Sequence, residues 1–175
     1  SGIVIVKELS KASGVWNLKT HFSKVADGAW PNFFYELDYL VIAGGGGATG
    51  CATGGAGAGG MRMSGYGPSP LQGSALEITP GSYTITVGAG GAAGPASNVL
   101  GSPGSNSVFS CITSTGGGHG GNINAVGAAG GSGGGGSGSL SVPTVAPGGA
   151  GNTPPVDPPQ GNPGGAGFDG RVAKT

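Results

Sequence analysis

A glycine motif follows a strand-like segment early in the chain, and in that position such a motif can bind the phosphates of a nucleotide. Residues 38–43 (DYLVIA) have the pattern of a strand, and residues 45–50 carry glycine at their first, third and sixth positions. Phosphate binding requires a helix to begin at the motif and an acidic residue about 20 positions later. The glycines within 54–60 would break such a helix, and no acidic residue lies between Asp38 and Glu77. We therefore predict no nucleotide site and no cofactor.

Histidine and cysteine are too few to predict a metal site. The two histidines are His21 and His119, and Cys111 precedes the second by eight positions. A metal site uses three or four convergent ligands at recognisable spacing, which these residues do not provide. Cys51 and Cys111 can form one disulfide or remain as two free structural thiols.

The carboxylates give no sign of an acid–base pair, because they are dispersed along the chain. They are Glu8, Asp27, Glu36, Asp38, Glu77, Asp157 and Asp169. Serine is abundant, but no nucleophile-elbow motif accompanies it. We expect the chain not to be an enzyme.

Charge excludes further classes of function. Seven basic and seven acidic side chains give a formal net charge of zero, and charged residues are 8% of the chain. Nucleic-acid binding needs a basic surface that displaces counterions from phosphates, so we do not expect it. No apolar run approaches the roughly 20 residues of a membrane-spanning helix, so we expect no membrane insertion. The chain begins at Ser1 without a basic leader, which indicates a processed product or a piece of a longer chain.

Glycine is the dominant residue, with 44 of the 175 positions, and it is clustered in tracts such as 44–60 and 116–138. Each glycine costs roughly 0.5–1 kcal/mol of conformational free energy relative to alanine when it is ordered. The tracts are therefore either flexible linkers or a packing surface made of bare backbone.

Strand-like segments alternate with these tracts. Ile3–Val6, 33–43, 83–87 and 105–115 are rich in β-branched and aromatic residues, and 83–87 alternates as a half-buried strand does. Near residues 16–27, apolar side chains at helical spacing predict a short helix that Trp16 and Trp30 bracket.

This alternation favours order. Glycine and proline tracts adopt the polyproline-II conformation, which has three residues per turn and directs its amides and carbonyls outward to neighbouring segments. We predict a mainly β fold with a small sheet, packed polyglycine-II-like segments and one short N-terminal helix. The predicted divisions are 1–32 (strand and helix), 33–142 (glycine-rich β domain) and 143–175 (Pro/Gly-rich tail). A core with so few side chains indicates that oligomerisation adds stability.

Bulky side chains interrupt the tracts at a few places, and they are the candidate functional residues. They have two interpretations, as packing caps over the glycine segments or as side chains displayed for binding on a rigid scaffold. The candidates for display are Met61, Arg62, Met63, Tyr66, His119 and Asn122.

Four motifs occur in an order that resembles a known family. They are DYLVIAGGGG (38–47), GGAGAGGMRMS (54–64), GSYTITVGAGG (81–91) and SVFSCITSTGGGHGG (107–121). Together they resemble the glycine-rich domain of bacteriophage tail-fibre and adhesin proteins, and SGVWNLKTHFSKVADGAWP (13–31) is similar to the tryptophan-bracketed segment that accompanies it. The resemblance covers roughly residues 1–140.

The resemblance implies a structural protein of the virion, in a tail fibre or on the particle surface, that forms a homo-oligomer, with a trimer favoured. It implies other virion proteins as partners, and a glycan or protein of the host surface as the receptor. The strand at Ile3–Val6 departs from the family pattern, in which a similar strand ends the domain. The alternative is a non-viral extracellular structural protein, such as a surface filament or a glycine-rich matrix protein. A depolymerase fused to a fibre would need a catalytic domain that these residues lack.

Overall fold

The computed structural model describes residues 18–26, 34–48, 50, 53–96, 99–138 and 145–168. The chain divides into two compact units. Ser1–Leu37 and Glu77–Gly81 make up the first, and Asp38–Leu76 and Ser82–Thr175 make up the second. The strand predicted at Ile3–Val6 lies outside the described residues, as does Cys51.

The first unit contains helix α1 (Leu18–Ala26), whose bounds fall inside the predicted range 16–27. Phe22 and Val25, both on the predicted apolar face, are 73% and 50% exposed. The helix is followed by β1 (Tyr35–Leu37), which pairs with β5 (Leu76–Ile78) in a two-stranded sheet.

A three-stranded sheet in the second unit contains β2 (Leu40–Ile42), β3 (Met61–Ser64) and β4 (Gln72–Gly73) in that order. Strand β3 is central: it pairs antiparallel with β2, with Val41 opposite Arg62, and parallel with β4.

A second three-stranded sheet is antiparallel throughout. It contains β6 (Ile85–Thr86), β7 (Ser107–Phe109) and β8 (Ile112–Ser114), and β7 and β8 form a hairpin. The half-buried alternation predicted for 83–87 is wrong, because Ile85 and Val87 are 68% and 83% exposed.

The predicted strand at 33–43 is two strands in two different sheets. The break falls at Asp38 and Tyr39, where one serine binds both residues. The Tyr39 amide donates to Ser64 Oγ at 3.0 Å, and that hydroxyl donates to Asp38 Oδ1 at 3.0 Å. The backbone here is therefore held by a side chain of β3 instead of continuing as one strand.

The side-chain core of the second unit is small. Val41, Met63 and Ile112, from β2, β3 and β8, are its largest buried apolar residues. Ser114 is fully buried beside them, and its hydroxyl donates to the Val41 carbonyl at 2.7 Å. Burial of so few apolar side chains leaves most of the packing to the backbone.

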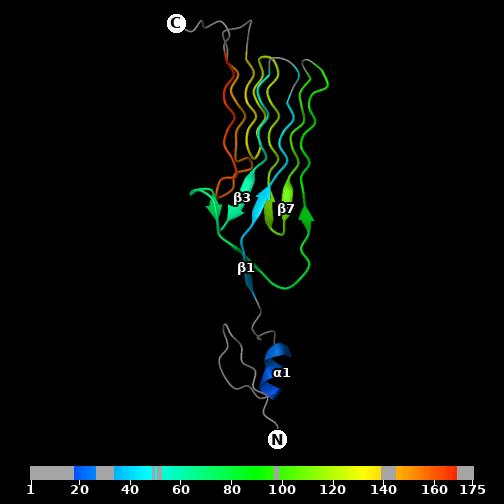
Figure 1. Ribbon diagram of the computed structural model, residues 1–175, viewed down its shortest axis with the longest axis vertical. Coiled ribbons are helices and arrows are strands. Elements are labelled where there is room, and N and C mark those ends of the chain that lie inside the picture. The colour runs from blue at the N-terminus through cyan, green and yellow to red at the C-terminus, as the bar shows by residue number, and fades with distance from the viewer. Residues whose placement is uncertain are drawn as a thin grey trace. The chain divides into compact units, whose positions relative to one another are not determined.

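Extended glycine-rich segments make up the rest of the second unit. In Figure 1 they run side by side from the strands to a set of turns at the opposite end. We call them together the glycine bundle. They are residues 43–48, 53–60, 88–94, 100–106, 115–121, 125–131, 132–138, 145–151 and 161–168.

Neighbouring segments of the glycine bundle bond to each other at every third residue. The Gly54 amide donates to the Gly121 carbonyl at 3.2 Å. Three residues on, the Gly57 amide donates to the Gly118 carbonyl at 2.8 Å. A three-residue repeat is the repeat of the polyproline-II helix, whose backbone meets a given neighbour once per turn. The prediction of packed polyglycine-II-like segments is therefore confirmed.

Two segments form the interior of the bundle. Residues 115–121 bond to five neighbours, namely 43–48, 53–60, 100–106, 125–131 and 132–138. Residues 132–138 also bond to five, namely 53–60, 115–121, 125–131, 145–151 and 161–168. Most glycines of both interior segments are buried. Because their backbone groups pair with neighbouring segments, a core without large side chains satisfies its polar groups.

Close approach explains why these positions are glycine. A Cβ added to Gly54 would lie 2.0 Å from the Gly135 carbonyl oxygen, and one added to Gly118 would lie 2.0 Å from that of Ala128. Backbone conformation is not the cause, because among the described glycines only Gly65 and Gly67 have positive φ. The tracts thus use glycine for its missing side chain.

The predicted Pro/Gly-rich tail contributes two segments, 145–151 and 161–168, to the same bundle. Between them, the loop at 152–160 is ordered by two side chains. Asn152, with φ of 49°, accepts bonds from the amides of Val156 and Gln160. Gln160 is only 2% exposed, and its backbone carbonyl accepts a bond from the Met61 amide at 2.8 Å.

Candidate attachment surface

Several segments of the glycine bundle end on the side away from strands β2, β3 and β7, where the turn at 122–125 joins two of them (Figure 1). Hydrogen bonds place several of them at one level. The Gly94 amide donates to the Ala48 carbonyl, and the Ser137 amide donates to the Ala125 carbonyl. The Gly167 amide donates to the Ala146 carbonyl. We call this end of the bundle the loop end.

Apolar side chains are exposed at the loop end. They lie in described turn residues and at the adjoining ends of bundle segments, and each is 44–62% exposed. They are Val99, Leu100, Ile123, Val126, Val145 and Phe168. The loop end therefore exposes apolar side chains among small, uncharged residues. Turns held by a rigid scaffold are a common location for binding residues, and this placement makes the loop end the candidate surface.

The best-described turn of the loop end is 122–125. The Ala125 amide donates to the Asn122 carbonyl at 2.7 Å, which closes the turn, and Asn122 Oδ1 accepts a bond from the Ile123 amide. Asn124 has φ of 61°, a left-handed conformation that asparagine tolerates better than most residues. The turn therefore holds Ile123 outward on a backbone that both asparagines fix.

Three of the predicted display residues lie on β3, at the other end of the bundle. Met63 is buried, and Met61 and Arg62 are half-buried. A Cβ added to Gly67 would lie 2.1 Å from the Met63 sulfur, so the following turn packs closely on this side chain. For Met63 this placement favours the packing interpretation over display.

The other three predicted residues lie in two places, because Tyr66 is at the strand end of the bundle and away from His119 and Asn122. Tyr66, in the turn after β3, is 83% exposed. His119 is half-buried on the interior segment 115–121, with Nδ1 3.0 Å from the Gly120 carbonyl. Asn122 alone lies at the loop end. The six predicted residues thus do not form one site.

The sequence pattern identified the loop end only in part. Ile123 interrupts a glycine tract beside Asn122 and was recognisable as such an interruption. The other apolar residues stand singly or in pairs within small-residue stretches, where nothing distinguishes a turn from a segment. A bulky residue that stands alone in a small-residue stretch marks an interruption of the tract, but it does not show whether that residue lies in a turn.

Few side chains in the described part of the chain offer metal-binding or thiol chemistry. Within the described residues no group of three or more His, Cys, Asp or Glu is placed to hold a metal ion. Cys111, in the β7–β8 turn, is a free and exposed thiol.

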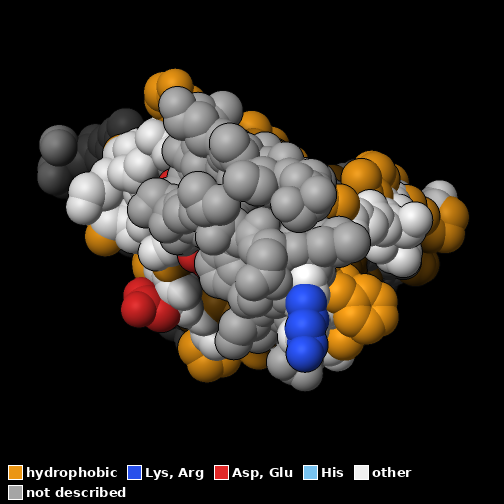
Figure 2. All heavy atoms as spheres, turned by 90° about the horizontal axis from the view of Figure 1, so that it is seen from below, with side chains coloured by type: hydrophobic (Ala, Val, Ile, Leu, Met, Phe, Trp, Pro, Cys, Tyr) orange, Lys and Arg blue, Asp and Glu red, His pale blue; other side chains and the backbone are white. Residues whose placement is uncertain are grey.

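None of the helices in the described part of the chain has the length and apolar character to cross a membrane. Figure 2 views the molecule from the side opposite the loop end, where charged side chains are few and separate and hydrophobic ones project at several points.

A family model described as a glycine-rich domain matches residues 24–175. The chain has no significant match among curated proteins or among solved structures.

Proposed function

We propose that this chain, which belongs to the glycine-rich domain family, is a structural component of a bacteriophage particle, in a tail fibre or on the virion surface, that helps the particle to attach to its host. Its partners are further copies of itself, other virion proteins, and a glycan or protein of the host surface. It acts by binding and presentation without chemistry.

One observation carries this proposal. The apolar side chains of the loop end are held by turns whose flanking segments are tied laterally at every third residue. A rigid support of this kind lowers the entropy that the turns lose on binding, and that loss otherwise weakens an interface. The ordered series of motifs that resembles phage adhesins points to the same role.

Two measurements test the proposal. Mass spectrometry of purified particles should find the chain in fixed stoichiometry with the other virion proteins. The purified full chain should also compete with particles for adsorption to susceptible bacteria. A chain that is missing from particles but enriched in a cell-surface or matrix fraction would instead indicate the non-viral structural protein.

A further inference from the structure

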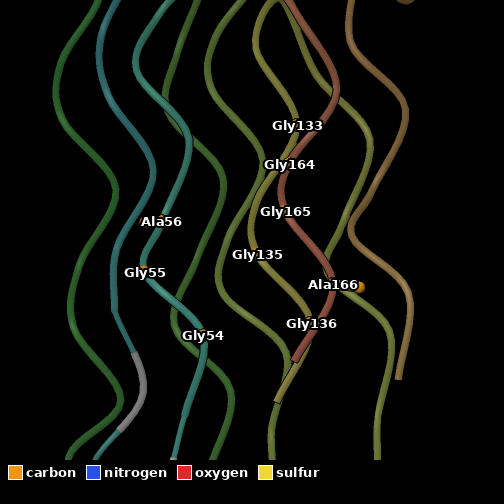
Figure 3. Close-up of a pocket in the computed structure, with 9 residues that line it drawn as sticks. All are labelled: Gly54, Gly55, Ala56, Gly133, Gly135, Gly136, Gly164, Gly165 and Ala166. Carbon is orange, nitrogen blue, oxygen red and sulfur yellow. The ribbon is translucent and has the colours of Figure 1, made fainter. Parts of the chain in front are cut away.

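An open groove runs along one side of the glycine bundle, with a volume of about 400 Å³. Residues 54–56 form one wall, residues 164–166 form the other, and Gly133, Gly135 and Gly136 form the floor (Figure 3). Both walls bond to the floor: the Gly135 amide donates to the Gly55 carbonyl at 2.8 Å, and the Gly136 amide donates to the Gly165 carbonyl at 2.9 Å.

The groove is an unfilled position in the array of extended segments. The two walls share the floor segment, and no hydrogen bond joins one wall to the other in the described part of the chain. The backbone amides of Gly55, Ala56, Gly165 and Ala166 likewise have no hydrogen-bond partner among the described residues.

The walls also leave room for a further segment. A Cβ added to Gly55 or Gly165 would have no heavy atom within 4 Å. Most other bundle glycines, such as Gly54, would meet a neighbouring carbonyl at about 2 Å instead. The groove therefore admits an extended backbone with small side chains, in the way that an open sheet edge admits an added strand.

The chain itself has a segment suited to this position. Residues 88–94 bond to only two neighbours, 43–48 and 100–106, and the amides of Gly90, Ala92 and Ala93 have no partner among the described residues. Ala89 and Ala92 are exposed and offer methyl groups that the space above Gly55 and Gly165 would accept.

Two further properties favour a second copy as the source of this segment. Ile85 and Val87, just before it, are 68% and 83% exposed, and a neighbouring copy would cover them. The zero net charge of the chain removes the repulsion that keeps many proteins apart.

We propose that residues 88–94 of one copy lie in the groove of the next, with Ala92 above Gly165. The contact is head-to-tail, because it joins two different surfaces, and such contacts close into rings when the rotation between copies allows it. A trimer is one such ring. The proposal concerns assembly alone and does not depend on the attachment function.

The first test measures the mass of the full chain in solution by light scattering over a range of concentrations. The wild-type chain should form an oligomer, and Gly55→Leu or Gly165→Leu should reduce its mass to that of one chain. The matched control is Gly81→Leu, which fills open space in a turn outside both surfaces and should leave the oligomer intact. A wild-type chain that is monomeric throughout, or groove variants that stay oligomeric, would overturn the proposal.

The second test identifies the occupant. With Cys51 and Cys111 replaced by serine, copies carrying Ala92→Cys are mixed with copies carrying Gly165→Cys and treated with a short bismaleimide. We expect a cross-linked pair in the mixture and at least tenfold less from either variant alone. An oligomer that the groove substitutions break, but that gives no such pair, would overturn the assignment of 88–94 as the occupant.

Discussion

The backbone amide of Thr115 donates a hydrogen bond at 2.8 Å to the side-chain oxygen of Gln160, 45 residues later in the chain. The side-chain amide of Gln160 returns a bond to Thr115 Oγ1 at 3.2 Å and donates a second to the Pro154 carbonyl at 3.1 Å. One buried amide therefore joins the start of an interior segment to the loop at 152–160. This connection lies where the strands end and the glycine bundle begins.

Replacement of Gln160 by alanine should destabilise the protein. The Thr115 amide and the Pro154 carbonyl would lose their partner in a half-buried site, at a cost of about 1–3 kcal/mol. Chemical denaturation should record the loss as a lower midpoint with an unchanged slope. Gln72→Ala, at an exposed glutamine, is the control and should change the free energy of unfolding by less than about 0.5 kcal/mol. Equal effects of the two substitutions would contradict the anchoring role of Gln160.

Adjacent glycines of one segment should respond oppositely to alanine. At Gly54 the new Cβ would lie 2.0 Å from the Gly135 carbonyl oxygen, so the two segments must separate. Overpacking of this kind costs about 1–3 kcal/mol or more. In a single chain the new methyl at Gly55 would enter open space, so at concentrations where the chain is monomeric the lower entropy of the unfolded chain should make Gly55→Ala neutral or stabilising by up to about 1 kcal/mol.

Thermal unfolding of the two variants side by side checks this prediction. They share chemistry, segment and local sequence, and they differ in what the added methyl group meets. A similar loss of stability at both positions would show that alanine acts through the backbone instead of through contact with the neighbouring segment.

Ser114→Ala should weaken the contact between the two three-stranded sheets. The Ser114 hydroxyl is fully buried, and it donates to the Val41 carbonyl of β2 at 2.7 Å. Loss of one buried hydrogen bond costs on the order of 1 kcal/mol, and more where the acceptor finds no other partner. Hydrogen exchange at the amides of β2 and β8 should become faster. Ser102→Ala, at an exposed serine, is the control, and equal rates in the two variants would argue against the prediction.

Local sequence patterns predicted those elements whose causes are local. Helix α1 follows from apolar residues at helical spacing, and the β7–β8 hairpin lies within a β-rich run. The break between β1 and β2 depends instead on Ser64, which is 26 positions away from Asp38. No pattern within 33–43 predicts the break between the two strands, because the whole stretch is strand-like.

The sequence also did not predict which segments of the glycine bundle lie next to each other. In a sheet or a helix, side chains specify which face meets which neighbour. In the glycine bundle a segment such as 115–121 meets five neighbours through backbone groups that nearly every residue carries. The tracts therefore indicate lateral packing without indicating its order. For the same reason the sequence did not identify the loop end, where Val145 and Phe168 differ from the other residues of their segments only in size.

Removal of apolar side chains from the loop end should reduce attachment to host cells without unfolding the protein. Ile123 and Phe168 are 44% and 62% exposed, so Ile123→Ser with Phe168→Ser should change stability little. If these residues contact the receptor, each should contribute about 1–2 kcal/mol to binding, and the double variant should bind at least tenfold more weakly. Tyr66→Ser, which removes a more exposed aromatic at the other end of the bundle, should bind as the wild type does. Binding of labelled full-length protein to susceptible cells measures all three. Loss of binding in the Tyr66 variant alone would move the attachment surface from the loop end to the turn after β3.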